Sequence, residues 1–170
     1  MKVSELARAL GISEVQRREF RNQIKLMAVE GTLVRLRGGR YGLPDKMNLA
    51  TGIFCGHPNG YGFLTSDTSE QKGDIYISPK RTAGAMHRDK VVARIESHNS
   101  SGRPEGRIMR ILERSTTSLV GLFEPLDGNG WVIPMDNKFC DIFVSSKHKL
   151  GAKTGQIVVV DIISYSEKHQ

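Results

Sequence analysis

Two short aromatic segments most strongly restrict how this chain can fold. They are residues 60–64 (GYGFL) and residues 74–77 (DIYI). Side chains alternate between the two faces of a strand, so Tyr61 and Phe63 share one face of the first segment. If the segments are neighbouring strands, Tyr76 joins these two rings. The opposite face then carries the aliphatic side chains of Leu64, Ile75 and Ile77 and predicts a core.

The rings have two interpretations. Glycines at positions 60 and 62 leave the ring faces uncovered by neighbouring side chains, so that a nucleic-acid base can lie flat on each ring. Such stacking contributes about 1–3 kcal/mol per base. Alternatively, the rings pack in a core, as aromatic side chains often do in strands. Because the other face of both strands is already apolar, the sequence favours the stacking surface.

The charge balance points to a polyanionic partner. The 170 residues include 25 Lys and Arg against 18 Asp and Glu, a net charge of +7. This excess favours nucleic acid, although a soluble basic protein without such a partner could have the same composition. Cys55 and Cys140 are far apart and lack metal-ligand spacing, so we expect two reduced thiols. No signal peptide or membrane-spanning apolar run is visible, and we expect a cytoplasmic protein without a membrane partner.

Residues 1–46 predict a winged helix-turn-helix unit. Apolar residues recur at helical spacing from Val3, and Ser13 is expected to cap a second helix over residues 14–30. Two strand-like runs around Gly38-Gly39 then predict a hairpin, the wing. Its candidate nucleic-acid contacts are the basic residues Arg18, Arg21 and Lys25 on the helix and Arg35, Arg37 and Arg40 on the wing. A protein-docking unit with a merely solvated basic face is the alternative.

The rest of the chain predicts two β-barrels. Five short strands with a longer connection after the third predict an OB-fold over residues 50–114, and a weaker copy predicts a second over residues 118–166. Basic residues in and after the longer connection are candidate phosphate contacts: Lys80, Arg81, Arg88 and Lys90. In the copy, Trp131 and Phe143 are the remaining candidate stacking rings, and core packing explains them equally well. The fold class is therefore multi-domain and mainly β.

Residues 60–63 and 74–77 resemble the two RNP-type motifs of cold-shock domains. The longer strings at residues 73–79, 85–91, 103–107 and 112–114 resemble bacterial ribonuclease R of the RNase II/RNB family, as does the domain order. The resemblance implies a 3′-to-5′ exoribonuclease acting on structured RNA. It also implies a following nuclease domain, with metal-binding aspartates and a divalent ion such as Mg²⁺, and an S1-type domain. None of those catalytic or metal-binding carboxylates can be placed on this chain, and we expect no activity from it alone.

Two departures accompany this resemblance. Arg88 stands where the family usually has glycine, and Asn59 and Gly56 stand roughly where cold-shock proteins often carry Lys and Trp. The sequence therefore leaves several functions open besides RNA recruitment for a nuclease. These are a stand-alone RNA chaperone, a winged-helix DNA-binding regulator and a protein-docking module.

Overall fold

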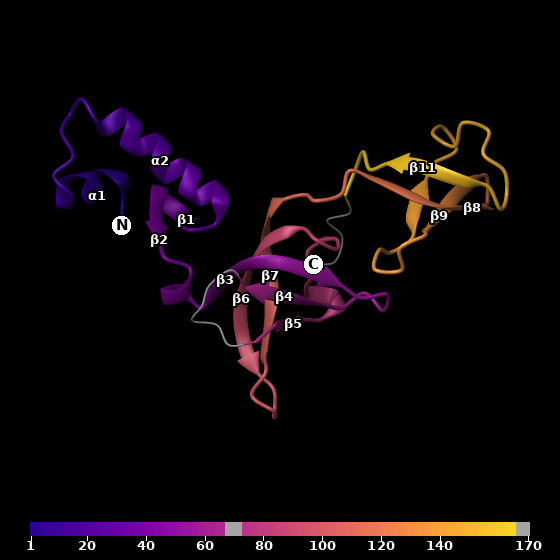
Figure 1. Ribbon diagram of the computed structural model, residues 1–170, viewed down its shortest axis with the longest axis horizontal. Coiled ribbons are helices and arrows are strands. Elements are labelled where there is room, and N and C mark those ends of the chain that lie inside the picture. The colour runs from indigo at the N-terminus through magenta and orange to yellow at the C-terminus, as the bar shows by residue number, and fades with distance from the viewer. Residues whose placement is uncertain (67–72, 166–170) are drawn as a thin grey trace.

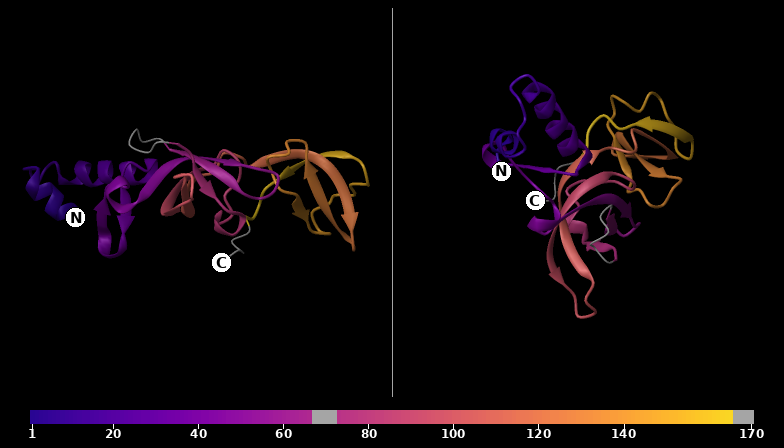
Figure 2. Two further views of the ribbon diagram at one scale, coloured as in Figure 1. Left: turned by 90° about the horizontal axis from the view of Figure 1, so that it is seen from below. Right: turned by 60° about the vertical axis from the view of Figure 1, so that its left-hand side comes forward.

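The structure is a computed structural model that describes residues 1–66 and 73–165 (Figure 1). It contains a helical unit, a closed barrel and a second, open sheet, in that order along the chain. The barrel lies between the other two units, and the three form an elongated row (Figure 2). The chain is thus mainly β, with helices α1 and α2 confined to its start.

The helical unit consists of α1 (Val3–Ala9), α2 (Arg17–Glu30) and the hairpin of β1 (Val34–Leu36) and β2 (Arg40–Gly42). A turn of 3-10 helix, η1 (Arg37–Gly39), joins the two strands, as the Gly-Gly pair predicts. Gly31 ends α2 in the left-handed conformation, with φ of 89°. The small core of the helical unit contains the buried side chains of Ile24, Ala28 and Tyr41.

The start of α2 differs from the sequence prediction. Residues 14–16 form a turn, and the helix begins at Arg17 with Gln16 as the N-cap residue. The expected cap, Ser13, contacts this glutamine instead, because its Oγ donates to Oε1 of Gln16 over 2.9 Å. A side-chain contact of this kind competes with helix formation, and a sequence pattern does not reveal it.

The C-terminal end of α2 is fastened to the barrel. Arg110 donates from Nη2 to the carbonyl oxygen of Ala28 over 3.0 Å, and Thr51 donates from Oγ1 to that of Gly31, also over 3.0 Å. These side chains satisfy two of the carbonyl groups that a helix end leaves without intrahelical partners. A short 3-10 turn, η2 (Asp45–Met47), then leads into the first barrel strand.

Five strands close the barrel in the order β3-β4-β5-β7-β6. They are β3 (Leu49–Gly56), β4 (Gly62–Ser66), β5 (Ile75–Ile77), β6 (Lys90–His98) and β7 (Pro104–Glu113). The connection between β5 and β6 contains η3 (Pro79–Arg81). A parallel pair between β5 and β7 completes the circle. The OB-type order expected for residues 50–114 is therefore present.

The second unit is an open sheet, not the closed barrel expected over residues 118–166. Among the described residues it contains β8 (Ser118–Leu126), β9 (Asn129–Pro134), β10 (Ile142–Val144) and β11 (Ile157–Asp161), in the order β10-β9-β8-β11. Its registers nevertheless repeat those of the barrel, since Trp131 pairs with Phe143 as Phe63 pairs with Tyr76. The four strands correspond to β3, β4, β5 and β6.

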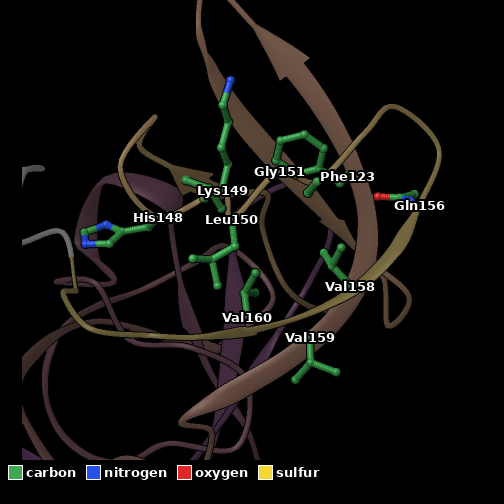
Figure 3. A pocket seen from close by; sticks show the side chains of 11 residues that line it. Phe123, His148, Lys149, Leu150, Gly151, Gln156, Val158, Val159 and Val160 are labelled. Carbon is green, nitrogen blue, oxygen red and sulfur yellow. The ribbon is translucent and has the colours of Figure 1, made fainter.

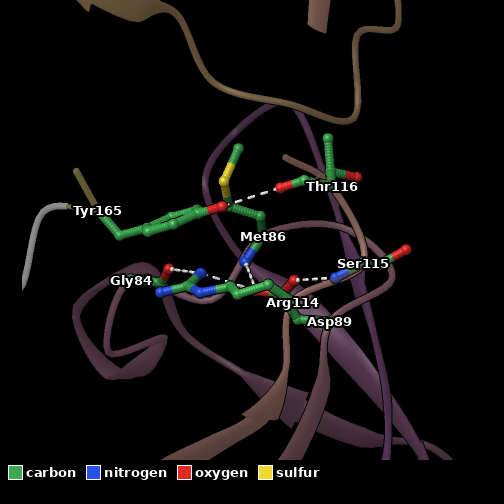
Figure 4. Close-up of polar contacts among 7 residues, drawn as sticks. All are labelled: Gly84, Met86, Asp89, Arg114, Ser115, Thr116 and Tyr165. Atoms are coloured by element: carbon green, nitrogen blue, oxygen red, sulfur yellow. Dashed lines mark hydrogen bonds and ion pairs between the residues drawn. The ribbon is translucent and has the colours of Figure 1, made fainter. Parts of the chain in front are cut away.

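A polar cluster holds the joint between the barrel and the second unit (Figure 4). Arg114 Nη1 lies 2.8 Å from Oδ2 of the buried Asp89, and its guanidinium lies 3.7 Å from the ring centre of Tyr165, beyond β11. The Tyr165 hydroxyl donates to the carbonyl oxygen of Thr116 over 3.0 Å. The segments on both sides of the second unit are thereby tied to the barrel.

In the described part of the chain, no helix is long and apolar enough to cross a membrane.

Candidate nucleic-acid interface

Three aromatic rings lie together on the outer face of β4 and β5. Phe63 and Tyr76 are direct cross-strand partners with ring centres 5.8 Å apart, and Tyr61 lies 5.8 Å and 5.7 Å from them. All three are half-buried. On the inner face, Leu64, Ile75 and Ile77 have no exposed surface. The alternation predicted from the sequence is confirmed: the aliphatic side chains form the core and leave the rings outside.

His57 extends this surface. Its ring stacks on Tyr61 with centres 4.1 Å apart and planes 14° apart. The turn between β3 and β4 fixes this position, because His57 N–H donates to the Tyr61 carbonyl over 2.8 Å and Asn59 N–H donates to His57 Nδ1 over 3.2 Å. One face of Tyr61 is therefore covered by protein. The sequence motifs did not identify this ring as part of the surface.

Arg103 is a second residue that the sequence analysis missed. Its guanidinium carbon lies 5.6 Å from the ring centre of Phe63. Asn99 holds the loop before β7 in place, because its Oδ1 accepts from the backbone N–H groups of Ser101 and Arg103 over 3.0 Å and 2.9 Å. No sequence pattern joins Phe63 to a residue forty positions away; only the pairing of β5 with β7 brings them together.

The predicted phosphate-binding cations differ in their exposure and in their ion pairs. Lys80 is exposed on η3, directly after the strand that carries Tyr76. Arg81 forms an ion pair with Glu96 over 2.9 Å, and Arg107 approaches the same carboxylate at 3.4 Å. Arg88 is exposed and Lys90 is half-buried. Lys80 is thus the cation beside the rings that is best suited to contact a phosphate.

His87 lies where the barrel meets the second unit. It is 6% exposed, and its Nδ1 accepts a hydrogen bond from the Gly56 N–H over 3.2 Å. Phe139, in the loop between β9 and β10, packs edge-on against its ring at 5.7 Å. Burial, followed by the charge of Lys138, lowers the pKa of His87 from its ordinary value. The neutral imidazole is thus part of this contact.

The second unit presents its own pair of rings. Trp131 and Phe143 meet edge to face with centres 5.4 Å apart, and they are 36% and 55% exposed. Other side chains on the outer face of the sheet are also exposed and apolar: Val120, Ile133, Ile157 and Val159. The structure thus leaves both rings outside the core, although core packing was an equally acceptable interpretation of the sequence.

The candidate cations of the helical unit are all at the surface. Those on α2 and on the hairpin are exposed: Arg18, Arg21, Lys25, Arg35, Arg37 and Arg40. The hairpin cations lie in β1, η1 and β2, around the tip.

An open pocket of about 360 Å³ lies on the inner side of the second sheet (Figure 3). Its lining includes Phe123, Val144 and Val158, and His148 and Lys149 lie at its edge. This lining is largely apolar and offers no nucleophile–base pair. Within residues 1–66 and 73–165, no group of three or more His, Cys, Asp or Glu side chains could hold a metal ion.

Family models match two parts of the chain. Residues 52–111 match the ribonuclease B OB domain, and residues 131–170 match a cold-shock domain. The first match coincides with the closed barrel, and the second begins at Trp131 on β9.

Curated relatives are similar over nearly the whole chain. Ribonuclease R of Escherichia coli is 35% identical over 160 residues, which cover 93% of this chain and 19% of the relative. Ribonuclease R of Thermotoga maritima is 34% identical over 153 residues, covering 88% and 21%. That of Acidithiobacillus ferrooxidans is 29% identical over 170 residues, covering 98% and 38%. The chain thus spans between about a fifth and two fifths of these relatives.

Solved structures agree on the fold. Yeast Ssd1, a pseudonuclease, superposes with a TM-score of 0.60 at 15% identity, over 72% of this chain and 21% of that one. Mycoplasma genitalium RNase R in complex with ribose-methylated single-stranded RNA gives a TM-score of 0.51 at 15% identity, over 70% and 19%. The sequence matches show that the chain belongs to the ribonuclease R family and corresponds to its N-terminal region of OB and cold-shock domains.

Proposed function

We propose that this chain binds single-stranded RNA and recruits it for a 3′-to-5′ exoribonuclease. One observation carries the proposal: Tyr61, Phe63 and Tyr76 form a continuous surface outside a core that is already complete. Rings that the core does not need are available to stack on bases. The solved structure of a similar RNase R contains single-stranded RNA.

Cations beside the rings guide the phosphate backbone in this proposal. The net charge of +7 attracts RNA from a distance, and Lys80 provides an exposed ammonium group shortly after the strand that carries Tyr76. The similar proteins are mostly about five times longer than the matched region. We therefore assign RNA cleavage, with its divalent metal ion, to a nuclease domain of the full-length enzyme, which also includes an S1-type domain.

The helical unit has a separate role in this proposal. Two helices followed by a hairpin have the element order of a winged helix-turn-helix, and the six candidate cations on α2 and the hairpin are all exposed. We assign it to the duplex part of structured RNA, since basic side chains of this kind contact phosphates without reading sequence. Competition between duplex RNA, duplex DNA and single-stranded RNA tests this role, and a preference for one duplex DNA site would favour a DNA-binding regulator.

Fluorescence anisotropy with labelled single-stranded RNA tests the main proposal. The Tyr61→Ala/Phe63→Ala variant removes two stacking rings and is expected to weaken binding by at least about tenfold, at about 1–3 kcal/mol per base. Met109→Ala, which shortens an exposed apolar side chain of the same barrel, is the matched control. Equal binding by the wild type and the double variant would contradict the proposal, provided that circular dichroism shows both folded.

The salt dependence of binding tests the cations separately. Each lost phosphate contact on single-stranded RNA flattens the log–log salt slope by about 0.7. Lys80→Ala is expected to flatten the slope of the logarithm of the binding constant against the logarithm of the salt concentration. Arg81→Ala should flatten it less, because Glu96 already pairs with that guanidinium. An unchanged slope for Lys80→Ala would remove Lys80 from the interface. Hairpin melting by this chain alone would favour the RNA-chaperone alternative.

A further inference from the structure

We infer that the surface beside Phe63 is a base subsite selective for guanine, with Asp74 and Arg103 reading the base edge. This inference rests on the proposed binding of single-stranded RNA. An open pocket of about 530 Å³ lies here. Its lining consists of Phe63, Gly73, Asp74, Ser101, Gly102, Arg103 and Pro104. One ring, one carboxylate and one guanidinium thus share a single hollow.

The strand registers place these three groups together. Phe63 and Thr65 are two residues apart on β4 and point to the same outer face. The pairing of Leu64 with Ile75 sets Asp74 opposite Thr65, whose Oγ1 donates to Asp74 Oδ1 over 3.0 Å. On the other side, β5 runs parallel to β7, with Tyr76 opposite Glu105. Two positions earlier on each strand, this register brings Arg103 beside Asp74.

Both charged groups remain available to a ligand. Asp74 and Arg103 are exposed, and within the described parts of the chain neither belongs to an ion pair. The contact with Thr65 orients the carboxylate and leaves Oδ2 free. Asn99 fixes the backbone before Arg103 while the guanidinium lies over Phe63 at 5.6 Å. The site is thus arranged before any base arrives.

Guanine is the base that suits both groups. Its Watson–Crick edge offers two neighbouring donors, N1–H and N2–H, to a carboxylate, and arginine recognises guanine O6 and N7. Cytosine offers one donor, N4–H, and ranks second. Uracil turns carbonyl oxygens toward the carboxylate on both sides of N3–H, and adenine places its N1 acceptor there. We therefore expect the order guanine, cytosine, then adenine and uracil.

Binding of substituted octauridylates tests the inference. Labelled octauridylate is compared with the same oligomer carrying one central guanosine, cytidine or adenosine, a length within the site size of an OB-fold. The guanosine oligomer is expected to bind about fivefold more tightly than octauridylate. We choose this factor from the lower end of the range for a good base contact because the site is exposed. The Asp74→Asn variant retains a partner for Thr65 and is expected to lose this preference, so that the guanosine oligomer binds no more tightly than octauridylate.

Glu105→Gln is the matched control, since it removes the same charge on the neighbouring strand from a residue outside the pocket lining. It should keep the preference for guanosine. Equal affinity for all four oligomers, or a preference that survives Asp74→Asn, would overturn this inference while leaving RNA binding intact. If no oligomer binds, the proposed function fails as well. Guanosine monophosphate can also be used to displace the labelled oligomer. If it does so as effectively as the unlabelled guanosine oligomer, the inference is overturned, because the site would then be a nucleotide pocket.

Discussion

The ring of Phe54 on β3 lies directly against Gly62 on β4, so closely that a Cβ atom at position 62 would collide with it. Phe123 and Gly130 repeat this relationship in the second unit. In both units the next residue along the strand carries an outward ring, Phe63 or Trp131. The glycine therefore lets one aromatic ring fill the core beneath the strand while the next ring stays outside.

We expect Gly62→Ala to destabilise the barrel and Gly130→Ala to destabilise the second sheet, each by about 1–3 kcal/mol, because the added methyl group overpacks a fixed ring. The two effects can be separated by fluorescence. The single tryptophan, Trp131, reports unfolding of the second sheet, and two of the four tyrosines, Tyr61 and Tyr76, report on the barrel. Gly62→Ala should lower the tyrosine transition more than the tryptophan transition, and Gly130→Ala should do the reverse.

Gly128→Asn is the control for these variants. Gly128 has φ of 80° and open space where a Cβ atom would stand, and asparagine tolerates this conformation. A destabilisation by Gly62→Ala no larger than that of this control would show that contact with the ring is unimportant.

The parts of the fold that depend on local alternation could be predicted from the sequence. Apolar residues at every second position identified the strands and their faces, and the spacing of Tyr61 and Trp131 revealed the repeat. Contacts made by loops could not be predicted in this way. The stacking of His57 depends on the shape of one turn, and the position of Arg103 over Phe63 depends on β5 meeting β7.

RNA binding should protect Cys55 from thiol reagents. Cys55 pairs directly with Phe63 on the outer face and is half-buried. A bound strand that covers the rings limits access to this thiol, so we expect alkylation of Cys55 to slow in the presence of single-stranded RNA. Cys140 is exposed in the second unit and is the internal reference, read in the same sample by mass spectrometry. Equal alkylation of Cys55 with and without saturating RNA would place the RNA elsewhere.

Replacing Arg88 by glycine should stabilise the barrel. Arg88 has φ of 71°, a left-handed conformation that costs a residue with a Cβ atom about 1 kcal/mol. Its side chain is exposed, and its backbone N–H bond to the Phe54 carbonyl, at 2.7 Å, does not depend on the side chain. Arg88→Gly should therefore raise the midpoint of urea unfolding. Arg88→Ala keeps the Cβ atom and should not, so equal gains from both variants would refute the backbone explanation.

The contact between the barrel and the second unit should weaken in mild acid. The pKa of His87 is lowered by burial and by Lys138 and Arg88, and Asp136 opposes this effect. The unfolded chain then binds the proton more readily, so the stability contributed by neutral His87 is complete above its ordinary pKa of 6.5 and is lost as pH falls below it. Protonation also removes the acceptor for the Gly56 N–H.

His87→Asn tests this pH dependence, because the asparagine carbonyl can accept from Gly56 and does not titrate. We expect unfolding midpoints between about pH 7 and pH 5 to fall less for this variant than for the wild type. His98→Asn, at an exposed position on β6, is the control and should retain the wild-type slope. Identical slopes for all three proteins would exclude His87 as the group responsible.

Arg114 is expected to contribute the largest single ion-pair effect. Its partner Asp89 is fully buried and also accepts from the backbone N–H groups of Met86 and Ser115. Arg114→Met leaves that carboxylate without a counter-charge, and breaking a buried pair in this way costs about 3–5 kcal/mol. Tyr165→Phe removes only the hydroxyl contact with Thr116 and keeps the ring beneath the guanidinium, so it should cost about 1 kcal/mol. Urea unfolding followed by tyrosine fluorescence measures both variants, and comparable losses would show that the joint depends on the hydroxyl contact of Tyr165 as much as on the buried pair.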